Sequence, residues 1–355
     1  MYKPFYSLLF TTLLISGHLN AESIKIIGTT SLTVKTPAGM LRGEENSRQI
    51  SLLKVQIDPN ARQLLAQHAK KSLLSDPTDS SGSNTRLPQQ IQLGMNGVPV
   101  LDQGNHGTCV TFAVTGALDA AIGEGDYLSQ LCPLQLGLHL ESNGYNPSGW
   151  DGTWGRHALS QFSAFGIVSK DQQREHGCGD LVEYPVTGAG NGQAMTLESY
   201  HELSESLEEK NIEWTQILDA NEALSSRVDT NQTLNEIKRT LSAGNRLTFG
   251  TLLLDFDLGF VGAVGSNKAN YDSWVLTPEI ARDIYISGDF GAHEMIITGY
   301  DDNAIAIDDH NQQHKGLLTL RNSWSDAVGD HGNFYMSYDY FKVLVIEAYR
   351  IKATG

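Results

Sequence analysis

The sequence predicts an α+β fold with two lobes, and three observations support this prediction. Residues 109–122 form an apolar run of helical length that stops at Gly123. Further helix-like segments lie mainly in the first part of the chain, whereas strand-like segments separated by polar turns gather after residue 246. Helices gathered early and antiparallel strands gathered late are typical of α+β folds. With 355 residues, of which 40% are hydrophobic, the chain can form a sizeable core.

Residues 1–21 are predicted to be a secretory signal peptide. Lys3 precedes an apolar stretch over residues 5–15, and Ala21 places a small residue at the cleavage position. This stretch is too short to span a bilayer, and no later segment reaches the roughly 20 apolar residues of a spanning helix. We therefore expect a protein secreted to the extracellular space or the periplasm, with no membrane partner. The net charge of −16 argues against nucleic acid as a partner.

Residues 22–74 are predicted to form a β-hairpin followed by a helix. β-Branched runs occur within residues 23–36, and residues 53–57 alternate between apolar and polar side chains. Asp58 and Pro59 then supply a helix cap and a first helical residue. A unit of this size is too small to be stable alone, so it must pack on a larger part of the chain.

Residues 75–86 are rich in Ser, Asp and Thr and are predicted to be a flexible linker that proteases can reach. The next ordered part runs from Leu87 to the C-terminus. The segment 196–230 is rich in acidic residues but also has apolar side chains at helical spacing. This pattern predicts a solvated surface helix. The other predicted elements are helices over residues 157–165 and 233–242 and strands over residues 246–254, 295–300, 304–307, 316–320 and 332–337.

Cys109 is predicted to be a reactive thiolate. A polar loop, residues 103–108, leads into the apolar run, and Thr108 lies near the expected N-cap of the helix. In the first helical turn, unpaired backbone N–H groups and the helix dipole favour an anion over the neutral thiol. A lone cysteine is more often a plain core residue. A buried helix that opens on a cysteine beneath a polar loop instead favours a nucleophile.

The chain has three cysteines, which is an odd number for an exported protein. One disulfide and one free thiol is the simplest arrangement. If Cys132 pairs with Cys178, Cys109 is the free one.

Acyl transfer by a thiolate needs an imidazole, a group that orients it, and donors for the oxyanion. His293 is the best candidate base because it ends a glycine-bearing loop at the start of a predicted strand. Asn322 follows another strand and can accept the far N–H of that imidazole. Gln103 can direct its side-chain amide to the same oxygen as the backbone N–H of Cys109. His106 is an alternative base.

These residues lie in motifs that resemble those of the papain-like cysteine peptidases, and the resemblance extends from residue 87 to the end of the chain. The matching segments are Leu-Pro at 87–88, Val-Pro-Val-Leu-Asp-Gln-Gly at 98–104, Gly-Thr-Cys-Val-Thr-Phe-Ala at 107–113, Ala-His-Glu-Met-Ile-Ile-Thr-Gly-Tyr at 292–300, and Asn-Ser-Trp at 322–324 followed by residues 329–334. The resemblance implies a helical lobe that carries the nucleophile and a β-barrel-like lobe that carries the histidine and the asparagine.

The resemblance also implies a secreted endopeptidase that acts on proteins or peptides, is made as a zymogen, and needs no metal or organic cofactor. The implied catalytic roles are Cys109 as nucleophile, His293 as base, Asn322 as its orienting group, Gln103 as oxyanion donor and Trp324 as a shield over the Asn–His bond. The implied substrate-binding residues are Gly152, Thr153, Trp154 and Ala292. An exopeptidase or transpeptidase of the same fold, and a noncatalytic binding or adhesion protein on this scaffold, remain alternatives.

The sequence departs from the family pattern at four points, one of which is Thr153 in the position after the family glycine Gly152. His106 and Trp150 occupy the positions of a family disulfide, whereas Cys132 and Cys178 fall where the family has a second bridge. The tryptophan that normally follows the nucleophile is replaced by valine. The nucleophile and the histidine also lie farther apart than the roughly 130–150 residues typical of the family, and residues 196–230 are the expected insertion.

Residues 22–74 do not resemble the long helical propieces of the family. We nevertheless expect them to be a propiece of atypical length, because a small dependent unit before a cleavable linker is suited to block a cleft. Cleavage within residues 75–86 would release it.

His310 and His314 have a spacing that suits a metal on a helix. They lie in a predicted polar turn with no third ligand beside them, so no metal site is expected.

Overall fold

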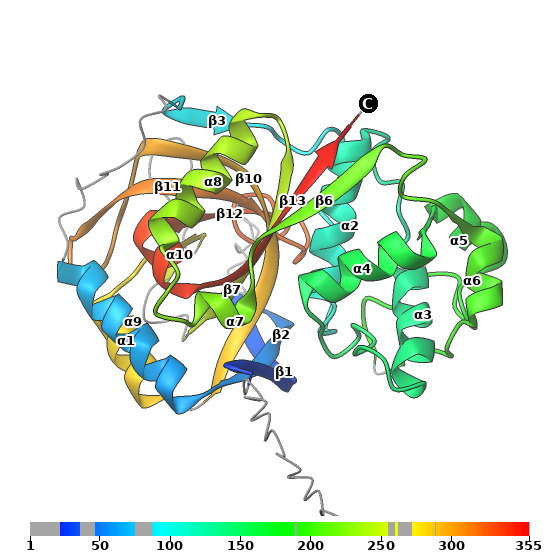
Figure 1. Cartoon of the computed structure of the whole chain (residues 1–355), viewed down its shortest axis with the longest axis horizontal. Helices are drawn as coiled ribbons and strands as arrows, with labels where there is room; N and C mark the ends of the chain where they lie inside the picture. Colours follow the sequence, from blue (N-terminus) through cyan, green and yellow to red (C-terminus); the bar gives the residue numbers. More distant parts are fainter. Residues whose placement is uncertain are drawn as a thin grey trace, which may run out of the picture.

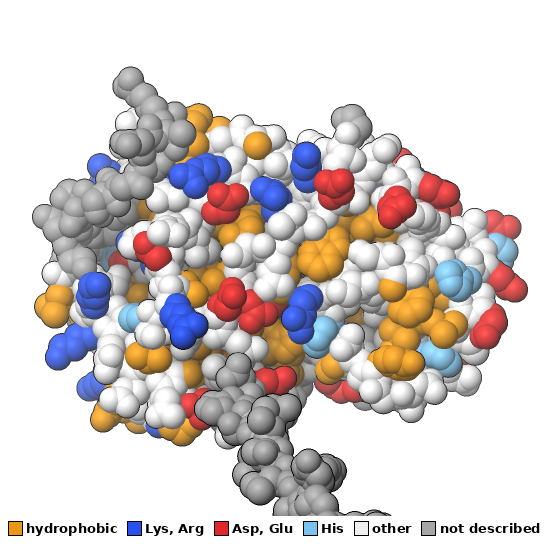
Figure 2. Space-filling model, in the orientation of Figure 1, with side chains coloured by type: hydrophobic (Ala, Val, Ile, Leu, Met, Phe, Trp, Pro, Cys, Tyr) orange, Lys and Arg blue, Asp and Glu red, His pale blue; other side chains and the backbone are white. Residues whose placement is uncertain are grey.

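The computed structural model describes residues 22–35, 47–74, 87–188, 190–254, 260–261, 272–287 and 289–354. The predicted signal peptide and the predicted 75–86 linker lie outside these residues. Figure 1 shows a helical lobe beside a lobe built on a β-sheet, which confirms the predicted α+β fold with two lobes. No helix in the described part of the chain is both long and apolar enough to span a membrane. On the face seen in Figure 2, acidic side chains lie over both lobes, whereas basic ones gather over the sheet lobe and the boundary between the lobes.

The helical lobe is organised around α2, which is buried along most of its length. The helix ends as predicted, because Gly123 adopts a left-handed φ of 80° at the C-cap. Cys132 and Cys178 form a disulfide in this lobe, and Cys109 is the free cysteine. The helices of the lobe are α2 (Cys109–Ile122), α3 (Leu131–Ser142), α4 (Gly155–Phe165), α5 (Lys170–His176) and α6 (Leu197–Leu203), with two short strands, β4 (Ile167–Val168) and β5 (Ser204–Glu205).

The second lobe is built on an 11-stranded sheet with β10 (Asp289–Ile307) at its centre. This strand pairs antiparallel with β2, β3, β7 and β11. The other strands are β1 (Ile24–Lys35), β2 (Ser47–Ile57), β3 (Gln90–Gln92), β6 (Ile212–Leu218), β7 (Arg246–Leu253), β8 (Phe260–Val261), β9 (Ser273–Trp274), β11 (Gln313–Arg321), β12 (Asn333–Ser337) and β13 (Val345–Ala353). The helices that accompany the sheet are α7 (Ala220–Ala223), α8 (Thr230–Ser242), α9 (Pro278–Ile286) and α10 (Tyr338–Leu344).

Two sequence predictions are corrected by this sheet. The segments at 295–300 and 304–307 belong to the single strand β10, whose pairing with β11 shifts register between Asp301 and Ile305. The surface helix predicted over residues 196–230 is wrong, because α6 ends at Leu203 and β6 then joins the sheet beside β13. The apolar side chains that suggested a solvated helix are instead used in packing, and Tyr200 has no exposed surface.

The predicted hairpin and helix at the N-terminus are confirmed. β1 (Ile24–Lys35) pairs antiparallel with β2 (Ser47–Ile57), and α1 (Pro59–Leu74) follows. Figure 1 shows the hairpin at the boundary between the two lobes. β2 also pairs with β10 over residues 289–292. The hairpin–helix segment therefore depends on the rest of the chain, because Val55 and Ile50 are buried in the common core.

Candidate active site

Cys109 is the first residue of α2, and its side chain is completely buried. Its sulfur receives hydrogen bonds from the backbone N–H groups of Glu294 and Val110. Glu294 follows His293 on β10, so this contact brings the start of the helix against the strand that carries the candidate base. The structure thus brings together Cys109 and Glu294, which lie far apart in the sequence.

The expectation of a thiolate is wrong for this buried arrangement. Burial raises the pKa of the Cys109 thiol to about 12, although the N–H groups of Glu294 and Val110 act to lower it. Removing a charged sulfur from water destabilises the thiolate more than these donors and the helix terminus stabilise it. The sulfur is a neutral thiol as long as it remains covered.

His293 is held by two contacts, one at the edge of its ring and one on its face. Its Nε2 lies 2.7 Å from Oδ1 of Asn322, and the indole of Trp324 stacks on it with ring centroids 4.7 Å apart. Because the Asn322 oxygen accepts, Nε2 carries the hydrogen and Nδ1 has the lone pair. Nδ1 is buried and has no hydrogen-bond partner among the described residues. Burial lowers the pKa of His293 to about 4, against the opposite effect of Asn322.

Gln103 is fully buried and has its side-chain amide in three hydrogen bonds. Nε2 donates to the carbonyl of Ser51 at 3.2 Å and to that of His106 at 3.0 Å. Oε1 accepts from the hydroxyl of Ser323 at 2.8 Å. A backbone carbonyl of β2 therefore lies at the amide that was predicted to bind an oxyanion.

Two of the four predicted substrate-binding residues contact Leu53 of β2. Leu53 is in register with Ala292, and a Cβ at Gly152 would lie 2.4 Å from the Leu53 side chain. Gly152 also has a φ of +111°, which favours glycine. Thr153 is buried, and Trp154 precedes the first residue of α4 and packs against the main core. The hairpin thus occupies the surface between Gly152 and Ala292.

Three other histidines that the sequence analysis considered lie in other contacts. His106 donates from Nε2 to the carbonyl of Pro185 at 2.8 Å, which argues against its role as the base. Its ring meets Trp150 edge to face at 5.1 Å, so the two positions of the absent family disulfide touch through their rings. His314 lies against Asp308 and Asp339, and His310 lies against Glu279. The two histidines with metal-like spacing therefore belong to different pairs.

A buried pair of carboxyl groups, Glu294 and Glu347, lies behind the nucleophile and was missed by the sequence predictions. Glu347 accepts from the Gly155 N–H at 3.1 Å and from the Tyr349 hydroxyl at 2.7 Å. A Cβ at Gly250 would lie 2.8 Å from a Glu294 oxygen and 2.9 Å from Cγ of Glu347. Glu294 could have been noticed as a lone acid within the apolar run 292–300.

Burial raises the pKa of Glu347 to about 7, and burial followed by the charge of Glu347 raises the pKa of Glu294 well above its usual value. The folded chain therefore retains protons that the unfolded chain releases near pH 4.5. The stability associated with this pair is present below that pH and is lost as the pH rises through about 7.

We expect Glu347→Gln to reduce the loss of melting temperature between pH 5 and pH 8. The amide can keep the contacts with Gly155 and Tyr349 but cannot acquire a buried charge. Thermal unfolding followed by circular dichroism at each pH measures the effect. Glu213→Gln, at an exposed position of the neighbouring strand β6, is the control. Equal pH dependence in all three proteins would contradict the assignment.

The sequence matches no family model and no curated protein. Among solved structures, it is similar to xylellain, a cysteine protease from Xylella fastidiosa, at 20% identity and a TM-score of 0.48 over 79% of this chain and 94% of that one. It is similar to procathepsin L 3 of the Tenebrio molitor larval midgut at 18% identity and a TM-score of 0.43 over 82% and 78% of the two chains.

A third similar structure is the bromelain protease of Ananas comosus in complex with E64, at 15% identity and a TM-score of 0.43 over 75% of this chain and 99% of that one. Similarity of this size leaves the function to be argued from the residues of the site.

Proposed function

We propose that the chain is a papain-like cysteine endopeptidase that hydrolyses protein or peptide substrates. The observation that carries the proposal is the placement of His293. The ring is fixed by Asn322 and Trp324, its Nδ1 is left without a partner among the described residues, and the next residue on the strand contacts the sulfur of Cys109. This arrangement suits a nucleophile, a base and a group that orients the base.

In the proposed reaction, the proton of the Cys109 thiol moves to Nδ1 of His293, and the sulfur attacks the carbonyl carbon of a peptide bond. The backbone N–H of Cys109 and the side-chain amide of Gln103 donate to the resulting oxyanion. The leaving amine takes the proton from Nδ1, which leaves an acyl-thioester. Water then gives a proton to Nδ1 and attacks the thioester, which releases the acid and restores the thiol.

The N-terminal hairpin is proposed to keep this site inactive until it is removed. Ser51 presents a carbonyl to Gln103, and Leu53 lies against Gly152. Arg48 forms an ion pair with Asp102, the residue before Gln103. We further propose that the hairpin, by lying on the neighbouring residues Gln103 and Gly152, keeps water from the sulfur and so maintains the high pKa of Cys109. Its removal would admit water, favour the thiolate and open the cleft to substrate.

The predicted signal peptide supports export of this zymogen, and the Cys132–Cys178 disulfide suits an oxidising compartment. We propose that cleavage within residues 75–86 separates the hairpin–helix segment from the peptidase. Below, "processed form" means the protein that has folded with the hairpin–helix segment attached, has been cleaved within residues 75–86, and has then been separated from that segment.

Labelling by a thiol-directed epoxide tests the function. We expect one equivalent to bind the processed form at Cys109, and Cys109→Ala to abolish it, because the other two cysteines are joined in a disulfide. Intact-mass spectrometry and peptide mapping measure the label. Absence of labelling in the processed form would instead support a noncatalytic binding protein on this scaffold.

A further inference from the structure

The loop of residues 184–186, which follows Cys178 of the disulfide in the sequence, lies directly against residues 103–108, the loop that precedes the nucleophile. The N–H of Asn105 donates to the carbonyl of Val186 at 3.2 Å. Gly104 has a φ of +62°, and a Cβ there would lie only 1.8 Å from the same carbonyl oxygen. Residues 184–186 therefore approach residues 103–108 so closely that only glycine fits at this point.

Tyr184 joins the two ends of the loop 103–108 through its hydroxyl. This hydroxyl donates to the backbone carbonyl of Gln103 at 2.8 Å and lies 2.8 Å from the hydroxyl of Thr108. A phenol has one hydrogen and a carbonyl can only accept, so Thr108 must donate to Tyr184. Tyr184 thereby holds Gln103, whose side-chain amide is one proposed oxyanion donor. It also holds Thr108, which precedes the other proposed donor, the backbone N–H of Cys109.

The ring of Tyr184 is fixed by other aromatic side chains. It stacks on Trp150 with centroids 5.6 Å apart and planes 3° apart, and it meets Phe112 at 4.8 Å. The indole N–H of Trp150 donates to the side chain of Gln135 on α3 at 3.2 Å. These contacts leave the hydroxyl little freedom to move away from the loop.

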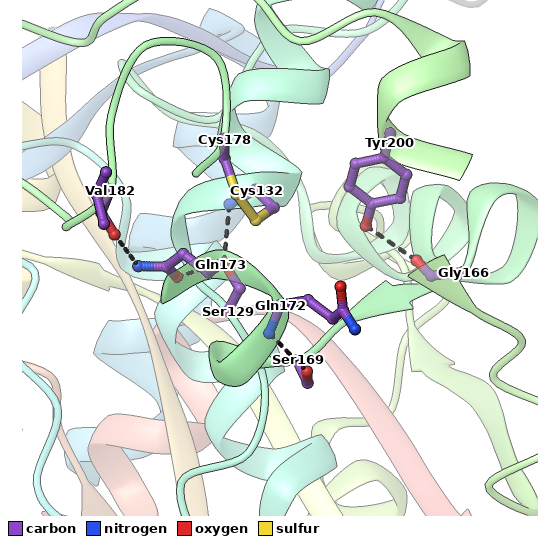
Figure 3. Close-up of a disulfide and its surroundings, with 9 residues drawn as sticks. All are labelled: Ser129, Cys132, Gly166, Ser169, Gln172, Gln173, Cys178, Val182 and Tyr200. Carbon is purple, nitrogen blue, oxygen red and sulfur yellow. Dashed lines mark hydrogen bonds between the residues drawn. A yellow bond between two sulfur atoms is a disulfide. The ribbon is translucent and has the colours of Figure 1, made fainter. Parts of the chain in front are cut away.

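The segment that carries Tyr184 is also attached to the body of the helical lobe. Figure 3 shows the disulfide between Cys132 and Cys178 beside Gln173, whose amide donates to the carbonyl of Val182 at 2.9 Å. The same side chain accepts from the hydroxyl of Ser129 at 2.7 Å. The chain is therefore held on α3 and α5 shortly before it reaches residue 184.

We propose that Tyr184 is a positioning residue that sets the spacing of the two oxyanion donors, an inference that rests on the proposed peptidase activity. Donors act on a transition state only if they are already placed where the negative charge develops. Without the hydroxyl, the carbonyl of Gln103 and the hydroxyl of Thr108 lose their common partner. The spacing of the donors is then less well defined, whereas the thiol and its base are untouched.

The test is Tyr184→Phe in the processed form, which removes the hydroxyl and keeps the ring. We expect kcat for a fluorogenic peptide to fall at least about fivefold with KM unchanged, because the hydrogen bonds to Gln103 and Thr108 are both lost. Affinity for a peptide aldehyde should fall by a similar factor, because its tetrahedral adduct needs the same donors. Alkylation of Cys109 by iodoacetamide forms no oxyanion, so its rate should stay within twofold of wild type.

Tyr145→Phe is the matched control, because Tyr145 is 72% exposed in the same lobe, and it should leave all three quantities unchanged. A Tyr184→Phe protein whose kcat and aldehyde affinity stay within twofold of wild type would overturn the inference. An equal slowing of hydrolysis and alkylation would also overturn it, because that result indicates a general structural effect. If the wild-type processed form is neither labelled nor active, the proposed function itself fails.

Discussion

His293→Ala in the processed form is expected to lower kcat/KM for a peptide substrate by about 10³-fold or more. Two losses combine in this variant. The thiol no longer has a base that can take its proton, and the leaving amine no longer has an acid that can supply one. The fold should be retained, because Trp324 remains packed against Trp274 and Phe334. Steady-state hydrolysis of a fluorogenic peptide measures the change.

His176→Ala serves as the control, because that histidine lies on α5 with 47% of its side chain exposed. It should hydrolyse the peptide at the wild-type rate. Asn322→Ala should lie between the two, because Asn322 orients the ring without exchanging a proton. A His293→Ala protein within tenfold of wild type would show that another group is the base.

Removal of the hairpin is expected to raise peptidase activity about 100-fold. A covered site reacts only in the small fraction of molecules whose hairpin is open, and minor conformers of this kind are commonly about 1% populated. The comparison is between the processed form and the uncleaved chain that begins at residue 22, with the same fluorogenic peptide. A chain with Cys109→Ala that is cleaved within residues 75–86 by an added protease gives the background.

Arg48→Ala tests the blocking role of the hairpin without cleavage of the chain. Its ion pair with Asp102 is partly exposed, so we expect only an increase of up to about fivefold in the activity of the uncleaved chain. Arg174→Ala, which removes a more exposed pair with Asp171, should change nothing. Equal activity of the cleaved and uncleaved chains would reject the blocking role of the hairpin.

Much of the fold could be predicted because it is encoded locally. The apolar run after Cys109, the hairpin–helix unit and the termination of α2 at Gly123 each follow from a short pattern. Residues 196–230 were predicted wrongly because their apolar side chains fit a helix as well as they fit the actual helix, turn and strand. Only the contact of β6 with β13, over a hundred residues later in the chain, selects the strand.

In the site, too, some features follow from local sequence patterns and others depend on contacts between distant segments. Gln103, Cys109, His293 and Asn322 could be selected as candidates because each lies in a motif or at the end of a predicted element. The pKa of Cys109 could not be predicted, since it depends on burial, and burial arises only when segments far apart in the sequence pack together. Tyr184 could not be found either, because it lies in an irregular loop with no periodic pattern.

The pairing of β2 with β10 would have a consequence for the protein if the hairpin is removed as proposed. Residues 289–292 then lose the backbone partners that β2 supplied, and an unpaired row of N–H and C=O groups faces outward. Such an edge accepts another extended chain, whether a peptide to be cut or a neighbouring molecule. Freshly activated protein at high concentration should therefore be prone to self-association, and short extended peptides should keep it monomeric.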